Sequence, residues 1–367
     1  MIKILYTIPN FDTAGSGKAL LNIAAGLDKS RFEPHIMCKH DRGAFFKTVE
    51  KSGIPVHLCN YETPMRPVIS GLRGCWKVSR VLREIKPDII HSFHYAADYS
   101  EALAARMAGC RWVFTKKNMN WGGSSKNGWL LRSKLANGII IQNTDMSTQL
   151  YPGSKKTHLI PRGVNTNNYR INQFANDNVS SEVKYIICVA NLVPLKGVEV
   201  LIEAFKEIRQ KSFSDNWKVK IVGDDTNEYG ASLKKKYQDL IKEQCLIFTG
   251  KVGDVKSELQ SSSIFVLPTL TGEGSPVSLL EAMSMGLPVI GSRIPGIVDQ
   301  LTPLGEDHLF EPGRSEDLSG KLKKFMDLSC AQKRELNENI SRYCRENWDI
   351  SIEIERHERF YLKTLGL

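Results

Sequence analysis

Short runs of branched apolar residues alternate along the chain with longer segments whose apolar positions recur every three to four residues. The runs predict strands and the periodic segments predict helices, which together are typical of a parallel sheet with crossover helices. In the first half we expect strands at 2–8, 34–38, 89–92, 112–115, 138–142 and 158–161, and helices at 19–27, 44–51, 72–85 and 96–108. A long polar stretch, 118–127, predicts a functional loop.

A polar, asparagine-rich segment then interrupts the pattern, and the alternation restarts at residue 185. We therefore expect a first domain over 1–165, a linker over 166–182 and a second domain over 183–349. In the second domain we expect strands at 185–190, 218–222, 246–249, 264–267 and 288–290, and helices at 198–209, 231–242, 277–285, 318–328 and 333–346, with a last helix at 350–365. The predicted fold is α/β, with two Rossmann-like, doubly wound βαβ domains facing across a cleft at their strand ends.

Charge is distributed unevenly between the two halves. The net charge is +10, but residues 1–165 contain 24 Lys and Arg against 11 Asp and Glu, a net of +13, which leaves −3 for the remainder. This excess predicts an anionic partner for the first half, and a basic surface that only keeps the chain soluble is the alternative. The eight cysteines form no CxxC pair, and no signal peptide or apolar run of ~18 residues is found. We expect a cytoplasmic chain without a metal site.

Two short motifs predict contacts with a phosphorylated ligand. The first is the sequence Gly15-Ser16-Gly17, after the first predicted strand. It is not a P-loop, because Asp12 and Ala19 stand at two of the required positions. Closely spaced glycines at a helix start still allow backbone N–H groups to approach a phosphate, and a tight turn without a ligand is the alternative.

The second motif runs from Thr271 into a predicted helix. Ser275 is a good N-cap and Pro276 a good first helical residue, so the amide of Val277 is expected to point toward the cleft. Glu273 and Glu281 are separated by seven residues and are expected on the same crevice. Two carboxylates beside a helix N-terminus suit a ligand that carries hydroxyls and phosphates.

With this pair of glutamates, the sequence resembles the retaining glycosyltransferases of the GT-B fold, family 4, also called glycosyl transferases group 1. The resemblance extends over nearly the whole chain and includes residues 15–17, 88–91, 160–165, 192–197, 222–224, 280–283 and 286–289. It implies that Glu281 holds the ribose hydroxyls of the donor nucleotide and that Glu273 contacts hydroxyls of the transferred sugar. It also implies that Lys196 neutralises the departing diphosphate, and that the last helix braces the first domain.

Three departures from the family pattern affect the site. Asn191 stands where an arginine is usual, so Arg162 or Lys117 is expected to supply the missing charge. Lys117 also replaces the usual cleft histidine, so Lys117 or Asn118 is expected on the acceptor side, and Asp299 stands where Glu is common. The resulting catalytic candidates are Glu273, Lys196 and Lys117, and the donor-binding candidates are Gly15, Ser16, Gly17, Arg162, Asn191, Lys196, Glu273, Gly274, Ser275, Pro276, Val277 and Glu281.

The resemblance implies a metal-independent hexosyltransferase without a cofactor. Its donor would be a nucleotide-diphosphate sugar and its acceptor a glycan or lipid-linked sugar of a bacterial surface polysaccharide or lipopolysaccharide, with no nucleic acid partner. A nucleotide-sugar epimerase of the same architecture and a non-catalytic nucleotide-sugar-binding protein remain as alternatives.

The predicted helix 72–85 suggests where such an enzyme works. Arg73, Lys77 and Arg80 recur on one face, and Trp76, Val81 and Leu82 are available to contact an apolar phase. Together with the charge of the first half, this predicts reversible docking on the inner face of the plasma membrane. A solvated basic helix is the alternative.

Overall fold

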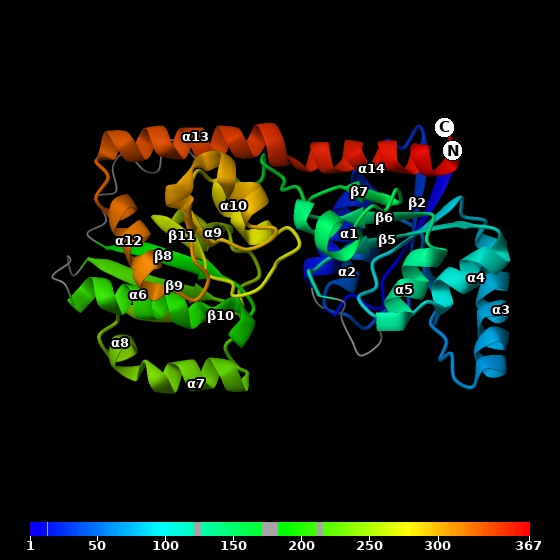
Figure 1. The fold of residues 1–367 in the computed structure, drawn as a ribbon, viewed down its shortest axis with the longest axis horizontal. Helices are drawn as coiled ribbons and strands as arrows, with labels where there is room; N and C mark the ends of the chain where they lie inside the picture. Colours follow the sequence, from blue (N-terminus) through cyan, green and yellow to red (C-terminus); the bar gives the residue numbers. More distant parts are fainter. Residues whose placement is uncertain (13, 121–125, 171–182, 211–215) are drawn as a thin grey trace. The chain divides into compact units, whose positions relative to one another are not determined.

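The computed structural model describes residues 1–12, 14–120, 126–170, 183–210 and 216–367, which form two compact units (Figure 1). Unit 1 consists of residues 1–162 and 351–367, and unit 2 of residues 163–350. Most of the predicted linker, 171–182, and part of the predicted loop, 121–125, lie outside the described residues. Each unit has its own parallel sheet, so the predicted α/β class is confirmed.

The sheet of unit 1 has the order β3-β2-β1-β4-β5-β6-β7. Its strands are β1 Ile2–Thr7, β2 Phe32–Cys38, β3 Val56–Leu58, β4 Ile89–Ser92, β5 Arg111–Lys116, β6 Gly138–Ile141 and β7 Thr157–Leu159. The helices are α1 Ala14–Gly26, α2 Phe46–Glu50, α3 Val68–Ile85, α4 Ser100–Ala108, α5 Lys126–Leu135 and α14 Ile350–Leu365, with a π-helical turn at Met146–Leu150.

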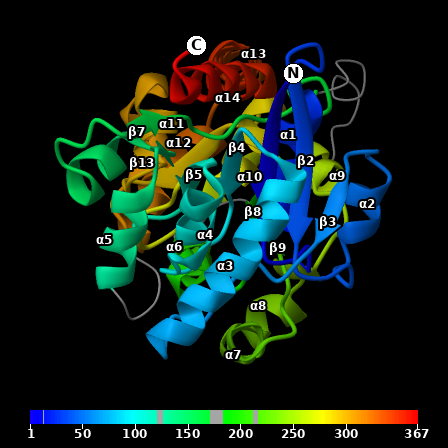
Figure 2. The same cartoon turned by 90° about the vertical axis from the view of Figure 1, so that its right-hand side faces the viewer.

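Alternation along the strands of unit 1 creates two apolar layers. In β1, Ile4 and Tyr6 face a core shared with α1 and α14, while Leu5 faces a core shared with α3 and α4. The α3 helix lies alongside α4 on that second face (Figures 1 and 2). Burial on both faces explains why these strands appear in the sequence as continuous apolar runs.

The sheet of unit 2 has the order β10-β9-β8-β11-β12-β13. Its strands are β8 Lys184–Val189, β9 Trp217–Val222, β10 Leu246–Gly250, β11 Ile264–Leu267, β12 Val289–Ser292 and β13 Leu309–Phe310. Its helices are α6 Val198–Gln210, α7 Glu228–Lys236, α8 Gln238–Lys242, α9 Lys256–Gln260, α10 Val277–Ser284, α11 Val298–Leu301, α12 Ser315–Met326 and α13 Cys330–Trp348, with 3-10 turns at Pro194–Lys196, Thr302–Leu304 and Glu306–His308. One face packs against α6 and α12, and the other against α10 and α13.

Two predicted helices differ from the observed ones. The α1 helix begins at Ala14 rather than near residue 17 or 19, so Gly15, Ser16 and Gly17 lie in its first turn and not in a preceding loop. The predicted helix 231–242 is divided into α7 and α8 at Tyr237, which leaves helical geometry. The Tyr237 side chain is buried, and its hydroxyl donates a 2.6 Å hydrogen bond to Glu203 Oε1 on α6.

Candidate active site

The strand order of unit 2 reverses at β8, which lies between β9 and β11. The connections that follow the central strands β8 and β11 therefore leave the sheet on opposite faces. Open α/β sheets bind ligands at such a point, beyond the carboxyl ends of the strands. Lys196 lies in the turn after β8, and Glu273 lies in the loop after β11. The structure brings these two predicted site residues together as an ion pair between Lys196 Nζ and Glu273 Oε1.

Backbone contacts fix the two loops that carry this pair. Gly197 has a φ of +62°, and a Cβ there would lie 2.0 Å from the carbonyl oxygen of Pro268. The amide of Leu270 donates a 2.8 Å hydrogen bond to the carbonyl of Leu195. Glu273 is held further by its own amide, which donates to the Pro295 carbonyl at 2.9 Å. The close approach thus explains the glycine after Lys196, which no other residue type could replace without moving the loop.

The hydroxyl of Thr269 donates a 2.9 Å hydrogen bond to the same Glu273 oxygen that pairs with Lys196. Thr269 is buried, whereas Lys196 and Glu273 are partly exposed. The carboxylate therefore has a fixed orientation but remains accessible. Thr269 is missing from the sequence prediction because a lone threonine after a strand has no distinguishing pattern.

The helix that follows Glu273 begins at Val277, the start of the predicted range 277–285, but its cap differs from the predicted one. Pro276 occupies the N-cap position and Val277 is the first residue of α10. Ser275 is therefore not the N-cap, and its hydroxyl instead accepts a 3.0 Å hydrogen bond from Gln300 Nε2. The change follows from the extended ψ of 115° at Pro276, which takes that residue out of the helix.

Glu281 lies on α10 and is only 8% exposed. Its carboxylate accepts a hydrogen bond from the hydroxyl of Tyr169, which sequence reasoning did not identify. Burial, then the negative charge of Glu281 and this hydrogen bond, raise the pKa of Tyr169. Glu273 and Glu281 thus have different polar partners, and their predicted shared crevice stays a prediction. Among the other donor-binding candidates of unit 2, Asn191 is exposed and Gly274 is buried.

In unit 1 the structure brings Ser16 and Lys117 together. Lys117 Nζ donates a 3.3 Å hydrogen bond to Ser16 Oγ and another to the carbonyl of Phe93, and it lies 4.2 Å from the ring centroid of Tyr95. Burial, and secondarily the nearby arginines, lower the pKa of Lys117 well below its usual value. A Cβ on Gly17 would lie 2.8 Å from the Phe11 ring, so packing alone requires a glycine there.

The neighbouring Lys116 is almost completely buried. Its ammonium group lies 4.6 Å from the ring centroid of Trp129 and donates hydrogen bonds to Asn118 Oδ1, at 3.0 Å, and to the Asn120 carbonyl. Burial lowers the pKa of Lys116 to about 8. Asn118, the second acceptor-side candidate, is therefore oriented by a buried lysine.

Arg162, which was expected to supply charge to the donor diphosphate, forms a buried ion pair with Glu353 on α14, with 3.1 Å between Arg162 Nη1 and Glu353 Oε1. His91 is completely buried between Tyr361 and Thr115, with hydrogen bonds of 2.7 and 2.8 Å to their hydroxyls. Arg162 thus connects to the last helix, α14, and His91 connects both to α14 and to the neighbouring strand β5. A contact of Arg162 with the donor stays a prediction.

Of the three apolar residues that were predicted to be available on α3, Trp76 is exposed, but Val81 and Leu82 are not. Leu82 is buried in the core and Val81 packs against it, because the spacing of Cys75, Val78 and Leu82 directs this face toward the sheet. Arg73, Lys77 and Arg80 are exposed, as predicted. The exposed apolar residues are Val68 at 60%, Ile69 at 69%, Leu72 at 41% and Trp76 at 51%.

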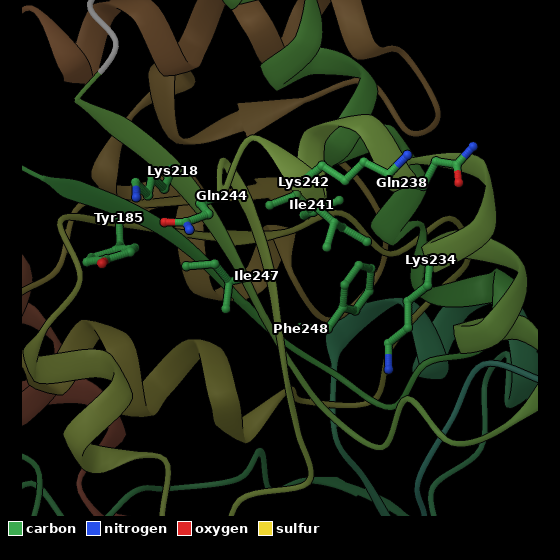
Figure 3. A pocket seen from close by; sticks show the side chains of 10 residues that line it. Tyr185, Lys218, Lys234, Gln238, Ile241, Lys242, Gln244, Ile247 and Phe248 are labelled. Atoms are coloured by element: carbon green, nitrogen blue, oxygen red, sulfur yellow. The ribbon is translucent and has the colours of Figure 1, made fainter.

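Unit 2 also contains a pocket of about 790 Å³ that includes none of the predicted residues (Figure 3). Tyr185 and Lys218 lie on the left of the view, and Lys234 and Gln238 lie on the right. Tyr185 and Lys218 are near the amino ends of β8 and β9, whereas Lys196 and Glu273 follow carboxyl ends. The pocket is thus separate from the candidate site.

Doubly wound α/β units with polar residues beyond the carboxyl ends of their strands are typical of proteins that bind nucleotides. The chain belongs to the family 4 glycosyltransferases: the model "Glycosyltransferase Family 4" matches residues 13–168, and the model "Glycosyl transferases group 1" matches residues 170–347. The predicted family and glycosyltransferase activity are confirmed.

Relatives and solved structures agree with this assignment. An uncharacterised glycosyltransferase of Haemophilus influenzae is 27% identical, over 82% of this chain and 83% of that protein. The UDP-Gal:α-D-GlcNAc-diphosphoundecaprenol α-1,3-galactosyltransferase of Escherichia coli is 28% identical, over 62% of this chain and 64% of that protein. A glycosyltransferase structure from Rickettsia africae has a TM-score of 0.84 at 17% identity, covering 99% of this chain and 98% of that one. The structure of Anabaena HepE in complex with UDP and glucose has a TM-score of 0.81 at 18% identity, covering 98% of this chain and 99% of that one. These two structures support the GT-B fold.

Proposed function

We propose that this glycosyltransferase retains the anomeric configuration of its donor, needs no metal ion, and transfers a hexosyl group to a glycan or lipid-linked acceptor of a bacterial surface polysaccharide. The observation that carries the proposal is the Lys196–Glu273 pair at the point where the strand order of unit 2 reverses. A cation and a carboxylate held there suit a ligand with a diphosphate next to a sugar. The acceptor class follows the E. coli relative, whose acceptor is a diphosphoundecaprenol-linked sugar.

In the proposed reaction, the bond between the anomeric carbon and the diphosphate oxygen breaks while the acceptor oxygen bonds to the same face of that carbon. The acceptor proton passes to the departing diphosphate. Lys196 and the amides near Gly274 and Val277 stabilise the developing charge, Glu273 accepts hydrogen bonds from the sugar, and Glu281 accepts them from the ribose. From unit 1, we propose that the first turn of α1 assists the diphosphate and that Lys117 and Asn118 contact the acceptor.

A product assay tests this function. The protein is incubated with UDP-, GDP- and ADP-sugars, with and without α-GlcNAc-diphosphoundecaprenol, in buffer containing EDTA. We expect a glycosylated lipid whose new linkage has the anomeric configuration of the donor. Conversion of the donor to its epimer without acceptor would indicate the epimerase alternative, and an unchanged donor that still stabilises the protein against heat would indicate a binding protein. Loss of transfer with EDTA would contradict metal independence.

We also propose that α3 docks unit 1 on an anionic membrane. The exposed residues Val68, Ile69, Leu72 and Trp76 repeat at helical spacing, and the exposed Arg73, Lys77 and Arg80 lie among them. The Arg80 guanidinium lies 5.3 Å from the Trp76 ring centroid. An apolar row with adjacent cations is complementary to acyl chains below anionic headgroups. In the described residues, the chain contains no helix that is long and apolar enough to cross a membrane.

Liposome flotation tests the docking. We expect binding to vesicles with anionic lipid, a decrease as salt rises, and a further loss in an R73Q/K77Q/R80Q variant, because each cation contributes about 1 kcal/mol near such a surface. A matched R42Q/K47Q/K51Q variant removes three exposed cations of unit 1 outside α3 and is expected to float like the wild type. Equal behaviour of the two variants would contradict docking through α3.

A further inference from the structure

Segment 163–169 enters unit 2 and is held against its helices. The amide of Val164 donates to the Trp348 carbonyl at 2.9 Å, and the amide of Ile350 donates to the Val164 carbonyl at 2.9 Å. Further along, the hydroxyl of Ser284, in the last turn of α10, donates a 2.8 Å hydrogen bond to the carbonyl of Tyr169. Both ends of the segment are thus fixed, and Tyr169 lies beside α10.

The side chain of Tyr169 is 3% exposed and packs in the core that includes Leu280 and Met283 of α10. Its hydroxyl donates to the carboxylate of Glu281, one turn before Ser284. Tyr169 therefore contacts α10 through its backbone, its ring and its hydroxyl. A phenol ring held in this way has little freedom to move, whereas a glutamate side chain has several rotatable bonds.

We propose that Tyr169 is a positioning residue that orients the Glu281 carboxylate for the ribose hydroxyls of the donor nucleotide. The inference rests on the ribose contact proposed above for Glu281. A carboxylate accepts hydrogen bonds through about four lone-pair positions, so one bond from Tyr169 is compatible with two from a ribose diol. The fixed phenol removes conformational freedom from Glu281 before the nucleotide binds, which strengthens binding by preorganisation.

Calorimetric titration tests this role. The probe is whichever of UDP, GDP and ADP binds the wild type most tightly, compared with its 2′,3′-dideoxy counterpart. We expect Tyr169→Phe to weaken binding of the ribonucleotide about fivefold and to leave binding of the dideoxynucleotide unchanged. A residue that only supports the local fold would weaken both to the same extent.

Tyr237→Phe is the matched control. Tyr237 is also a buried tyrosine of unit 2 whose hydroxyl donates to a carboxylate, that of Glu203, but it lies at the break between α7 and α8. We expect this variant to bind both nucleotides like the wild type. Equal weakening of both nucleotides by Tyr169→Phe, or no weakening, would overturn the inference. Glu281→Gln separates the two proposals, because an unchanged preference for the ribonucleotide in that variant would overturn the ribose contact itself.

Discussion

Four lysines in or shortly after the strands of the two sheets have different partners. In unit 2, Lys196 pairs with Glu273, and Lys220 pairs with Glu258 at 2.8 Å. In unit 1, Lys116 and Lys117 lie over aromatic rings and donate to carbonyl or amide oxygens. A carboxylate neutralises the charge of a buried ammonium group, whereas a ring or carbonyl only partly replaces its hydration. The difference shows in unit 1, where burial lowers the pKa of both Lys116 and Lys117, and where the contacts of their ammonium groups described above are with rings and uncharged oxygens.

The largest effect is expected at the charged residue of α10 in unit 2. Glu281→Ala should remove the two charge-assisted hydrogen bonds that we propose to the ribose, worth ~1.5–3 kcal/mol each, so kcat/KM should fall at least tenfold. Steady-state kinetics with the donor measure this. Glu258→Ala, which removes a carboxylate partner of Lys220 that is not among the candidate site residues, is the control. Kinetics near those of the wild type in a folded Glu281→Ala protein would contradict the assignment.

The pH dependence of the free energy of unfolding tests whether the buried Lys116 of unit 1 loses its proton readily. Its pKa of about 8 in the native state is below the ordinary value of 10.5, so between these pH values the unfolded chain binds a proton that the native protein does not. Stability therefore rises with pH in this window, by about 3 kcal/mol relative to a Lys116→Met variant. Urea unfolding of both proteins at pH 7.5 and 10.5 measures the change, with Lys47→Met, at an exposed lysine, as the control. A constant difference between wild type and Lys116→Met would show that the lysine keeps its charge.

The remaining prediction compares Lys196 and Lys117, the candidate catalytic lysines of the two units. Lys196→Met should weaken nucleoside diphosphate binding about tenfold, and nucleoside binding much less, because one charge-assisted hydrogen bond is lost. Lys117→Met should leave nucleoside diphosphate binding within about twofold of the wild type and slow transfer to the acceptor. Binding isotherms and transfer rates for both variants distinguish the roles, and a similar loss of nucleotide binding in the two variants would place Lys117 on the donor instead.

The sequence predicted the amphipathic helices and the central strands of the fold well, because their apolar patterns reflect burial directly. Helices α6 and α14 and strands β4 and β11 match their predicted ranges to within one residue. Short edge strands were missed: β3 and β13 have three and two residues, too few to show a period. The α5 helix was also missed, because it follows a polar stretch and its buried face includes Arg132, which a hydrophobic pattern assigns to the surface.

Candidate site residues were predicted where a short sequence motif identifies them. Examples are Lys196, which precedes Gly197, and Glu273, in the motif that begins at Thr271. Their partners were not predicted. Thr269 lies only four residues before Glu273 but belongs to no recognisable motif, and Tyr169 is brought near Glu281 by folding from a distant part of the chain. The exposed face of α3 was predicted only in part. The helix begins at Val68, four residues before the predicted start. The prediction missed this first turn because the β-branched residues Val68 and Ile69 do not favour a helix.

The division of unit 1 into two stretches of chain has a consequence for its biosynthesis. Residues 1–162 leave the ribosome before unit 2, but Phe360 and Tyr361, which complete one of their two cores, follow only after residue 350. At 5–20 residues per second, the intervening chain takes roughly 10–40 s to synthesise. Unit 2 can therefore close its cores first, while unit 1 waits with an open apolar face for its last helix. We therefore expect the nascent chain to expose more apolar surface at that stage than the folded protein does.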